Sequence, residues 1–269
     1  MVLEQLFAAQ WTYKKYHAFI LGFVYTLIGI VSARLVFYSS SGIMSVAFTS
    51  ILLIPSLAEL LKIEANQALK SYNFSIRRLW NDHADIFKVY IFLFMGIFVA
   101  YSLGTLLIPE SDVTSLFNAQ LKAAGVHGFA IVDAQLQSII LNNVLIFSVS
   151  FVLSLMYGAG AVVFLVWNAA VWGVVFSVFV RKAAIATGVD PVTAFARDLV
   201  PFLPHMMTEG AAYIGAAIVG GIVSKAVLRE KLFTKRFNYV VYDALAFLVF
   251  GLVLVIIAGI IEVKWFAGL

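Results

Sequence analysis

The stretch from Asn142 to Val180 constrains this chain more than any other, because its 39 residues include no charged side chain. About 20 apolar residues are enough for one helix to cross a bilayer, so this stretch is too long for a single span. The Gly158-Ala159-Gly160 sequence offers a break within it. We therefore predict two spans here, Asn142–Tyr157 and Gly160–Val180.

The composition extends this reading to the whole chain. Hydrophobic residues make up 63% of it and charged residues 12%, and the mean hydropathy is +1.00. Soluble domains carry roughly 25% charged residues, so the chain is predicted to be an all-α, polytopic transmembrane bundle with about seven spans. The other predicted spans are His17–Tyr38, Ile43–Leu61, Phe87–Ile108, Pro204–Ser224 and Tyr239–Ile261.

The basic residues predict how the chain is oriented. Its net charge is +4, and the positive residues gather between apolar segments, as the positive-inside rule requires of cytoplasmic loops. We therefore expect a multi-pass plasma-membrane protein with a cytoplasmic amino terminus and an extracytoplasmic carboxyl terminus. The lipid bilayer explains the positive charge, so nucleic acid is not an expected partner.

The connections between spans carry weaker signals. Apolar residues recur at helical spacing between Lys62 and Lys88, which predicts an amphipathic helix on the cytoplasmic face, with a solvated loop as the alternative. After Pro109, Ser111 or Asp112 is expected to cap a short helix, and Asp133 another. Pro191 is expected to start a short helix that ends at Arg197.

These predictions divide the chain into three parts. Residues 1–108 hold the hairpin of the first two spans, the amphipathic linker and the third span. Residues 109–141 form an extracytoplasmic loop with short helices. Residues 142–269 form the core helical unit, with short or broken helices near Gly158 and Pro204.

His205 and Glu209 are the most unusual residues of the predicted spans, because both lie on one face of a helix that is otherwise suited to lipid. Ionisable groups inside a membrane are costly and often mark a ligand route. Arg34 is predicted at the same depth on the first span. We expect Arg34 to pair with Glu209 beside His205 and to form a ligand or partner site. The alternative is that His205 and Glu209 extend to the lipid headgroups.

Three asparagines complete the candidate site. Asn142 and Asn143 start a span, where helix capping is the simpler role, and Asn168 lies deep in the next span, where a hydrogen bond between helices is the simpler role. A separate row of small residues permits close helix packing, within the chain or in a homodimer, and consists of Ala212, Ala216, Gly220 and Ser224.

Several kinds of chemistry are not expected. The chain has no cysteine, which excludes disulfides and thiolate clusters, and its four histidines show no metal-ligand spacing. His205 and Glu209 lack the second histidine of a metalloprotease helix, and no serine lies in a nucleophile motif. We therefore expect no cofactor, no metal and no catalytic residue.

The order of several motifs resembles that of a known family, the stage II sporulation protein M family. In the second half these motifs are Asn142-Asn143, Gly158-x-Gly160, Asn168, Pro204-His205 and Glu209. The first half is similar to the archaeal branch of the family, on the basis of Phe19-x-x-Gly22-Phe23 and Pro55. Met206 and Ala169 stand where the family commonly has glycine.

The resemblance implies a non-catalytic scaffold. Bacterial members act in membrane remodelling during engulfment, together with peptidoglycan-degrading partners, so this chain is expected to be a scaffold or remodelling component that acts with an unknown protein partner. The alternative is a transporter or channel for a small solute or ion, which would use the polar residues around His205 and Glu209. A solvent-connected cavity would favour transport, and a sealed core would favour the scaffold.

Overall fold

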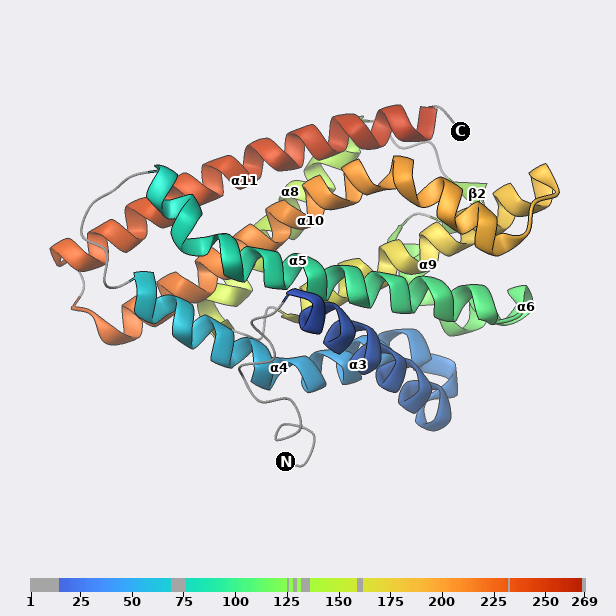
Figure 1. Ribbon diagram of the computed structural model, residues 1–269, viewed down its shortest axis with the longest axis horizontal. Coiled ribbons are helices and arrows are strands. Elements are labelled where there is room, and N and C mark those ends of the chain that lie inside the picture. The colour runs from blue at the N-terminus through green and yellow to red at the C-terminus, as the bar shows by residue number, and fades with distance from the viewer. Residues whose placement is uncertain are drawn as a thin grey trace.

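The computed structural model is a bundle of long helices (Figure 1). It describes residues 15–68, 76–124, 126–127, 130–131, 136–158, 162–231 and 233–267. The long helices are α3 (Lys15–Val36), α4 (Ser41–Ala68), α5 (Ile76–Leu107), α8 (Leu136–Tyr157), α9 (Val162–Thr187), α10 (Pro191–Arg229) and α11 (Lys235–Ala267). The short elements are the 3-10 helix η1 (Tyr38–Ser40), α6 (Glu110–Leu116), α7 (Asn118–Ala123), β1 (Val126–His127) and β2 (Ala130–Ile131).

Seven of the described helices are long and apolar enough to cross a membrane. This confirms the predicted all-α, polytopic bundle. The break at Gly158 is also confirmed, because α8 ends at Tyr157 and α9 begins at Val162. Gly158 has a φ of 58°, a left-handed conformation that glycine adopts without steric cost.

Helix α10 differs from the prediction, because it is one helix of 39 residues. We predicted a short helix from Pro191 to Arg197 and an interruption before the span at Pro204. Pro201 and Pro204 instead lie inside the helix, whose axis bends in their vicinity (Figure 1). A proline removes one backbone hydrogen bond and kinks a helix, but packing against neighbouring helices preserves the helix on both sides.

The linker between the second and third spans is also not a separate helix. Residues 62–68 continue α4, and residues 76–88 belong to α5. The hydrophobic spacing that suggested an interfacial helix is therefore split between the ends of two spans. Residues 69–75 lie outside the described part of the chain.

The connection after α5 contains the predicted short helical segment, as α6 and α7. Its apolar residues Val113, Leu116, Phe117 and Leu121 are buried. The N-cap is Pro109 rather than Ser111 or Asp112. The two strands that follow pair antiparallel, with Val126 opposite Ile131. The predicted cap at Asp133 lies outside the described residues.

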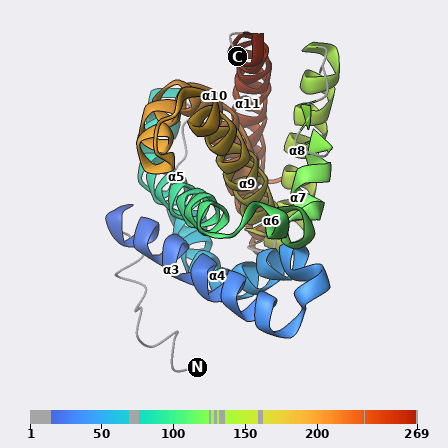
Figure 2. The same cartoon turned by 90° about the vertical axis from the view of Figure 1, so that its right-hand side faces the viewer.

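Two hydrophobic clusters form the interior. The larger one joins α3, α4, α5, α9 and α10 and includes the aromatic side chains of Phe98, Tyr101 and Phe176. The smaller one joins α8, α10 and α11, which lie together on one side of the bundle (Figure 2). Helix α10 contributes to both clusters. Side chains of α10 that lie where the two clusters meet therefore contact both of them.

Neutral polar groups hold the larger cluster together, in a region that we call the α4–α5–α9 contact. Ser45 Oγ and the Tyr101 hydroxyl share a hydrogen bond of 2.9 Å. Ser102 Oγ donates to the Gly173 carbonyl, and Ser177 Oγ donates to the Ser102 carbonyl at 2.7 Å. Gly173 permits this approach, because a Cβ there would lie 2.7 Å from Tyr101 Cβ and 2.8 Å from the Phe98 carbonyl oxygen. The helix backbones therefore meet directly.

The predicted small-residue face packs within the chain. Ala212 and Ala216 are buried in the smaller cluster, and a Cβ at Gly220 would lie 2.6 Å from the Phe151 carbonyl oxygen of α8. Ser154 of α8 donates a short hydrogen bond to the Ala217 carbonyl of α10. Ser224, at the end of the row, is only partly buried. Helix α8 of the same chain thus covers most of the face that we also considered for a homodimer.

Candidate functional site

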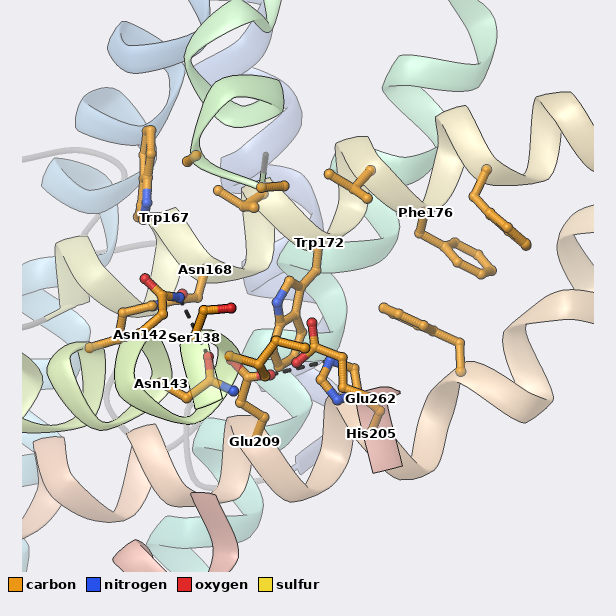
Figure 3. A pocket seen from close by; sticks show the side chains of 18 residues that line it. Ser138, Asn142, Asn143, Trp167, Asn168, Trp172, Phe176, His205, Glu209 and Glu262 are labelled. Carbon is orange, nitrogen blue, oxygen red and sulfur yellow. Dashed lines mark hydrogen bonds and ion pairs between the residues drawn. The ribbon is translucent and has the colours of Figure 1, made fainter. Parts of the chain in front are cut away.

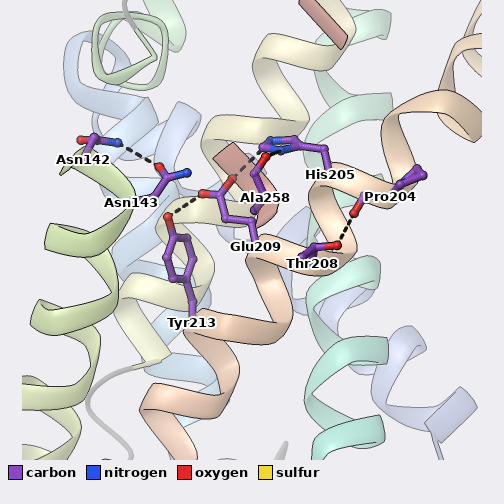
Figure 4. Close-up of polar contacts among 8 residues, drawn as sticks. All are labelled: Asn142, Asn143, Pro204, His205, Thr208, Glu209, Tyr213 and Ala258. Carbon is purple, nitrogen blue, oxygen red and sulfur yellow. Dashed lines mark hydrogen bonds and ion pairs between the residues drawn. The ribbon is translucent and has the colours of Figure 1, made fainter. Parts of the chain in front are cut away.

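A buried histidine and glutamate form the centre of the candidate site. Their spacing of four residues places both on one face of α10, and His205 Nε2 lies 3.2 Å from Glu209 Oε2 (Figure 4). Only 4% of His205 and 3% of Glu209 is exposed. Neither side chain therefore reaches outward as the headgroup alternative required.

Two neighbours fix the orientation of this pair. The Tyr213 hydroxyl donates a hydrogen bond of 2.6 Å to Glu209 Oε1, and His205 Nδ1 lies 3.4 Å from the Ala258 carbonyl oxygen of α11 (Figure 4). A carbonyl oxygen can only accept, so Nδ1 carries the hydrogen in this contact. His205 Nε2 is then left with a lone pair that faces the Glu209 carboxylate.

Aromatic rings surround the histidine on its other side. The centroids of Trp172 and Phe202 lie 5.4 and 5.7 Å from that of His205. Phe176 stacks on Phe202 at 4.9 Å. Phe176 and Phe202 belong to the larger hydrophobic cluster, so the histidine lies against apolar side chains. Electrostatic interactions are stronger in such surroundings than in water.

The pair faces a cavity of about 430 Å³ at the junction of the two hydrophobic clusters. One end of this cavity is formed by exposed residues that include Ala124, just after α7, and Asn142 of α8. The other end is formed by the buried pair, His205 and Glu209 (Figure 3). The arrangement is a pocket that leads from the surface to ionisable groups in the interior.

All three predicted asparagines line the same cavity. Asn142 and Asn143 lie well inside α8, which begins at Leu136, so they do not cap that helix. Asn168 donates to the Phe164 carbonyl of its own helix at 2.8 Å, and within the described residues no hydrogen bond from it to a neighbouring helix is found. The side chain of Asn143 interacts with Glu262, but its buried Nδ2 has no partner with hydrogen-bonding geometry among the described residues.

Arg34 is the exception among the predicted site residues. Its guanidinium lies 3.8 Å from Asp112 of α6, and both side chains are substantially exposed. Glu209 contacts His205 and Tyr213 instead, so the predicted pair between Arg34 and Glu209 is wrong. Depth along the membrane normal was the reason for that prediction, and depth does not determine which helices are neighbours.

Glu262 is the residue that sequence reasoning missed. It lies on α11 and lines the cavity beside His205 and Glu209 (Figure 3). One ligand atom from each of these three side chains lies within 4.8 Å of the other two. A carboxylate at the end of an apolar span usually faces the headgroups, so its position gave no signal. Only the packing of α11 against α10 brings it here.

The composition of the site determines what it can bind. A buried carboxylate is costly unless it is paired, hydrogen-bonded or neutralised, and this cavity holds Glu209, which is buried, beside Glu262, which is partly buried. Among the described residues that line the cavity, none is a lysine or an arginine. A cation or a polar solute that donates hydrogen bonds would complement these groups.

Comparison with known proteins gives the family. The family model for stage II sporulation protein M matches residues 84–265, which begin within α5 and include every residue of the cavity. No curated protein and no solved structure matched the chain. The match covers well over half of the sequence, and the chain belongs to the stage II sporulation protein M family.

Proposed function

We propose that this integral membrane protein binds a small polar or charged solute inside its helical bundle and moves it across the membrane as a transporter or channel. The observation that carries this proposal is the cavity of about 430 Å³, which joins exposed residues to His205, Glu209 and Glu262. Ionisable side chains inside membrane proteins are costly, and they commonly line substrate or ion pathways.

The helices around the cavity support the same proposal. Helix α10 contains Pro201 and Pro204 within four residues of His205, and α8 ends at Tyr157 before α9 begins at Val162. Interrupted or kinked helices often surround the binding sites of transporters, because they free backbone groups and permit movement of the two halves.

Access to the cavity can be measured directly, because the chain has no native cysteine. An Asn168→Cys variant in proteoliposomes should react with a membrane-impermeant thiol reagent. The matched control is Ser177→Cys on the same helix, where the side chain is fully buried in the α4–α5–α9 contact. Ser177→Cys should stay unmodified.

The side of labelling tests the transport step. A transporter or channel exposes Asn168→Cys to reagent added on either side of the membrane, whereas a one-sided pocket exposes it on one side only. Absence of labelling from both sides, with normal labelling of an exposed Ser115→Cys variant, would show that the cavity is sealed and would refute the proposal.

The orientation in the plasma membrane is a further part of the proposal. The basic residues near the α10–α11 connection support a cytoplasmic location for that end, and the α6–α7 segment would then face outward. In intact cells, Ser115→Cys should be labelled by the impermeant reagent and Thr234→Cys should be protected. The reverse pattern would invert the topology.

A scaffold or membrane-remodelling role is the second candidate. The family membership supports it, and so does the low burial of α8 and α11, each of which buries only 28% of its most apolar window. A photo-crosslinking residue at the exposed Phe250 should capture one protein partner in native membranes, while the same residue at the buried Phe176 should not. Crosslinks to lipid alone would count against this role.

A further inference from the structure

We infer that His205, Glu209 and Glu262 form a binding site for a divalent transition-metal ion. The inference rests on the proposed function and names the class of solute or bound ion for the same cavity. Three donor atoms, two from α10 and one from α11, lie within 4.8 Å of one another on side chains that line the cavity.

The positions of hydrogen atoms provide the first argument. His205 Nδ1 faces a carbonyl oxygen, so its hydrogen is used there and Nε2 presents a lone pair. Glu209 Oε2, only 3.2 Å away, also presents lone pairs when the carboxylate is ionised. Two acceptors at this distance repel unless a proton or a metal ion lies between them.

The distances provide the second argument. Two ligands of a tetrahedral zinc ion, with bonds of about 2.0 to 2.2 Å, lie about 3.4 Å apart. The observed 3.2 Å between His205 Nε2 and Glu209 Oε2 is close to this value. Glu262 offers a third ligand. Three protein ligands leave the fourth position open, and here it would face the cavity.

The neighbouring groups provide the third argument. Tyr213 donates to Glu209 Oε1 and leaves Oε2 for the ion, and the Ala258 carbonyl orients the imidazole ring. Hydrogen bonds of this kind position ligands in metal sites. The Asn143 side chain interacts with Glu262, and its Nδ2, which has no partner with hydrogen-bonding geometry in the described part of the chain, can orient that carboxylate or donate to a metal-bound anion.

The ligand types restrict the metal. One imidazole and two carboxylates suit Zn²⁺ or Mn²⁺, because Ca²⁺ takes six to eight oxygen ligands and Cu⁺ prefers sulfur. A divalent ion would also balance the two negative charges of Glu209 and Glu262. The competing arrangement is a proton shared between His205 and Glu209, which would make the pair an ordinary hydrogen bond.

The test uses the full chain, free of any affinity tag, in detergent and stripped of metal by a chelator. Titration calorimetry with Zn²⁺ and Mn²⁺ should show one site per chain, and Ca²⁺ should bind much more weakly. Glu262→Gln and Glu209→Gln should each weaken binding by at least about 100-fold, since even residues that only support a metal ligand contribute 10- to 100-fold. Glu59→Gln, at an exposed carboxylate, should bind as the natural chain does.

Thermal denaturation distinguishes a variant that has lost the metal site from one that has not folded. Zn²⁺ should raise the melting temperature of the natural chain and of Glu59→Gln, but not that of Glu262→Gln, which should be folded and of similar stability without metal. Equal binding by Glu262→Gln and the natural chain would overturn the inference, and so would the absence of a saturable site.

The metal inference and the proposed function fail separately. If Asn168→Cys is labelled from both sides but neither metal binds, the solute is not a divalent metal ion and the transport proposal stands. If Zn²⁺ binds at this site while Asn168→Cys is never labelled, the ion is held in a sealed core. The metal site then stands and the transport proposal is wrong.

Discussion

The two main polar regions inside this bundle differ in kind. The α4–α5–α9 contact consists of neutral hydroxyls that bond to one another or to backbone carbonyls. The cavity instead gathers a histidine and two carboxylates. Neutral hydrogen bonds join helices at little cost, whereas buried ionisable groups oppose stability unless they bind something. The first region therefore serves folding, and the second is where function is expected.

The largest expected effect lies in the α4–α5–α9 contact. Gly173→Ala places a methyl group against Tyr101 Cβ and the Phe98 carbonyl, so the helices must separate. We expect a loss of about 3 kcal/mol in the free energy of unfolding, at the upper end for overpacking. Gly215→Ala is the control, since nothing lies within 4 Å of the added Cβ. Equal melting temperatures for both variants in detergent would contradict the close contact.

In the cavity, by contrast, a substitution should raise the free energy of unfolding. Glu209→Gln keeps an acceptor for the Tyr213 hydroxyl, and its amide can donate to His205 Nε2 where two acceptors now face each other. In the metal-free protein we expect stability to rise by about 1 kcal/mol, because an unpaired buried charge is removed. Chemical denaturation of the metal-free variant measures this. A loss of stability would show instead that the Glu209 carboxylate stabilises the fold.

A smaller effect is expected for a single neutral hydrogen bond. Tyr101→Phe removes the hydroxyl that bonds to Ser45 but keeps the buried ring. Hydrogen bonds between membrane helices contribute about 0.6 kcal/mol on average, so the melting temperature should fall only slightly. Ser45→Ala should give a similar value. If the loss of this hydrogen bond is the whole effect, the double variant should have the same melting temperature as either single variant.

The smallest effect is expected outside both regions, at the exposed start of α10. Hydrogen bonds from the Thr193 side chain and backbone lower the pKa of Asp190. A lowered pKa gives stability that is present above the ordinary value of 3.8 and is lost as the pH falls through the folded pKa. Asp190→Asn should therefore reduce the fall in melting temperature as the pH drops below the ordinary carboxyl pKa of 3.8. An unchanged fall would show that the cap does not stabilise the helix.

The span pattern could be predicted from the sequence because it depends on local hydropathy. The uninterrupted apolar stretch and the Gly158 break determine α8 and α9, whatever their neighbours are. The continuity of α10 through Pro204 could not be predicted in this way. Proline removes a local hydrogen bond, and only contacts with other helices decide whether the helix continues.

The candidate site was predicted only in part, for the same physical reason. His205 and Glu209 share a helix face, so their spacing in the sequence determines that they meet. Whether Arg34 and Glu262 belong to the site depends on which helices pack together. The spacing of residues along the sequence gives no information on helix packing. Arg34 was assigned to the site and lies elsewhere, while Glu262 seemed an ordinary boundary residue and lies beside the pair.

The bend in α10 divides the helix into two segments. Pro191 to Leu203 form a rod about 20 Å long, at 1.5 Å per residue. A rotation of about 10° at Pro204 moves the far end of that rod by about 3 Å. Pro204 precedes His205 directly in the chain, so a change in the angle of the helix at Pro204 would be centred beside the imidazole that lines the cavity and would move the α9–α10 connection most.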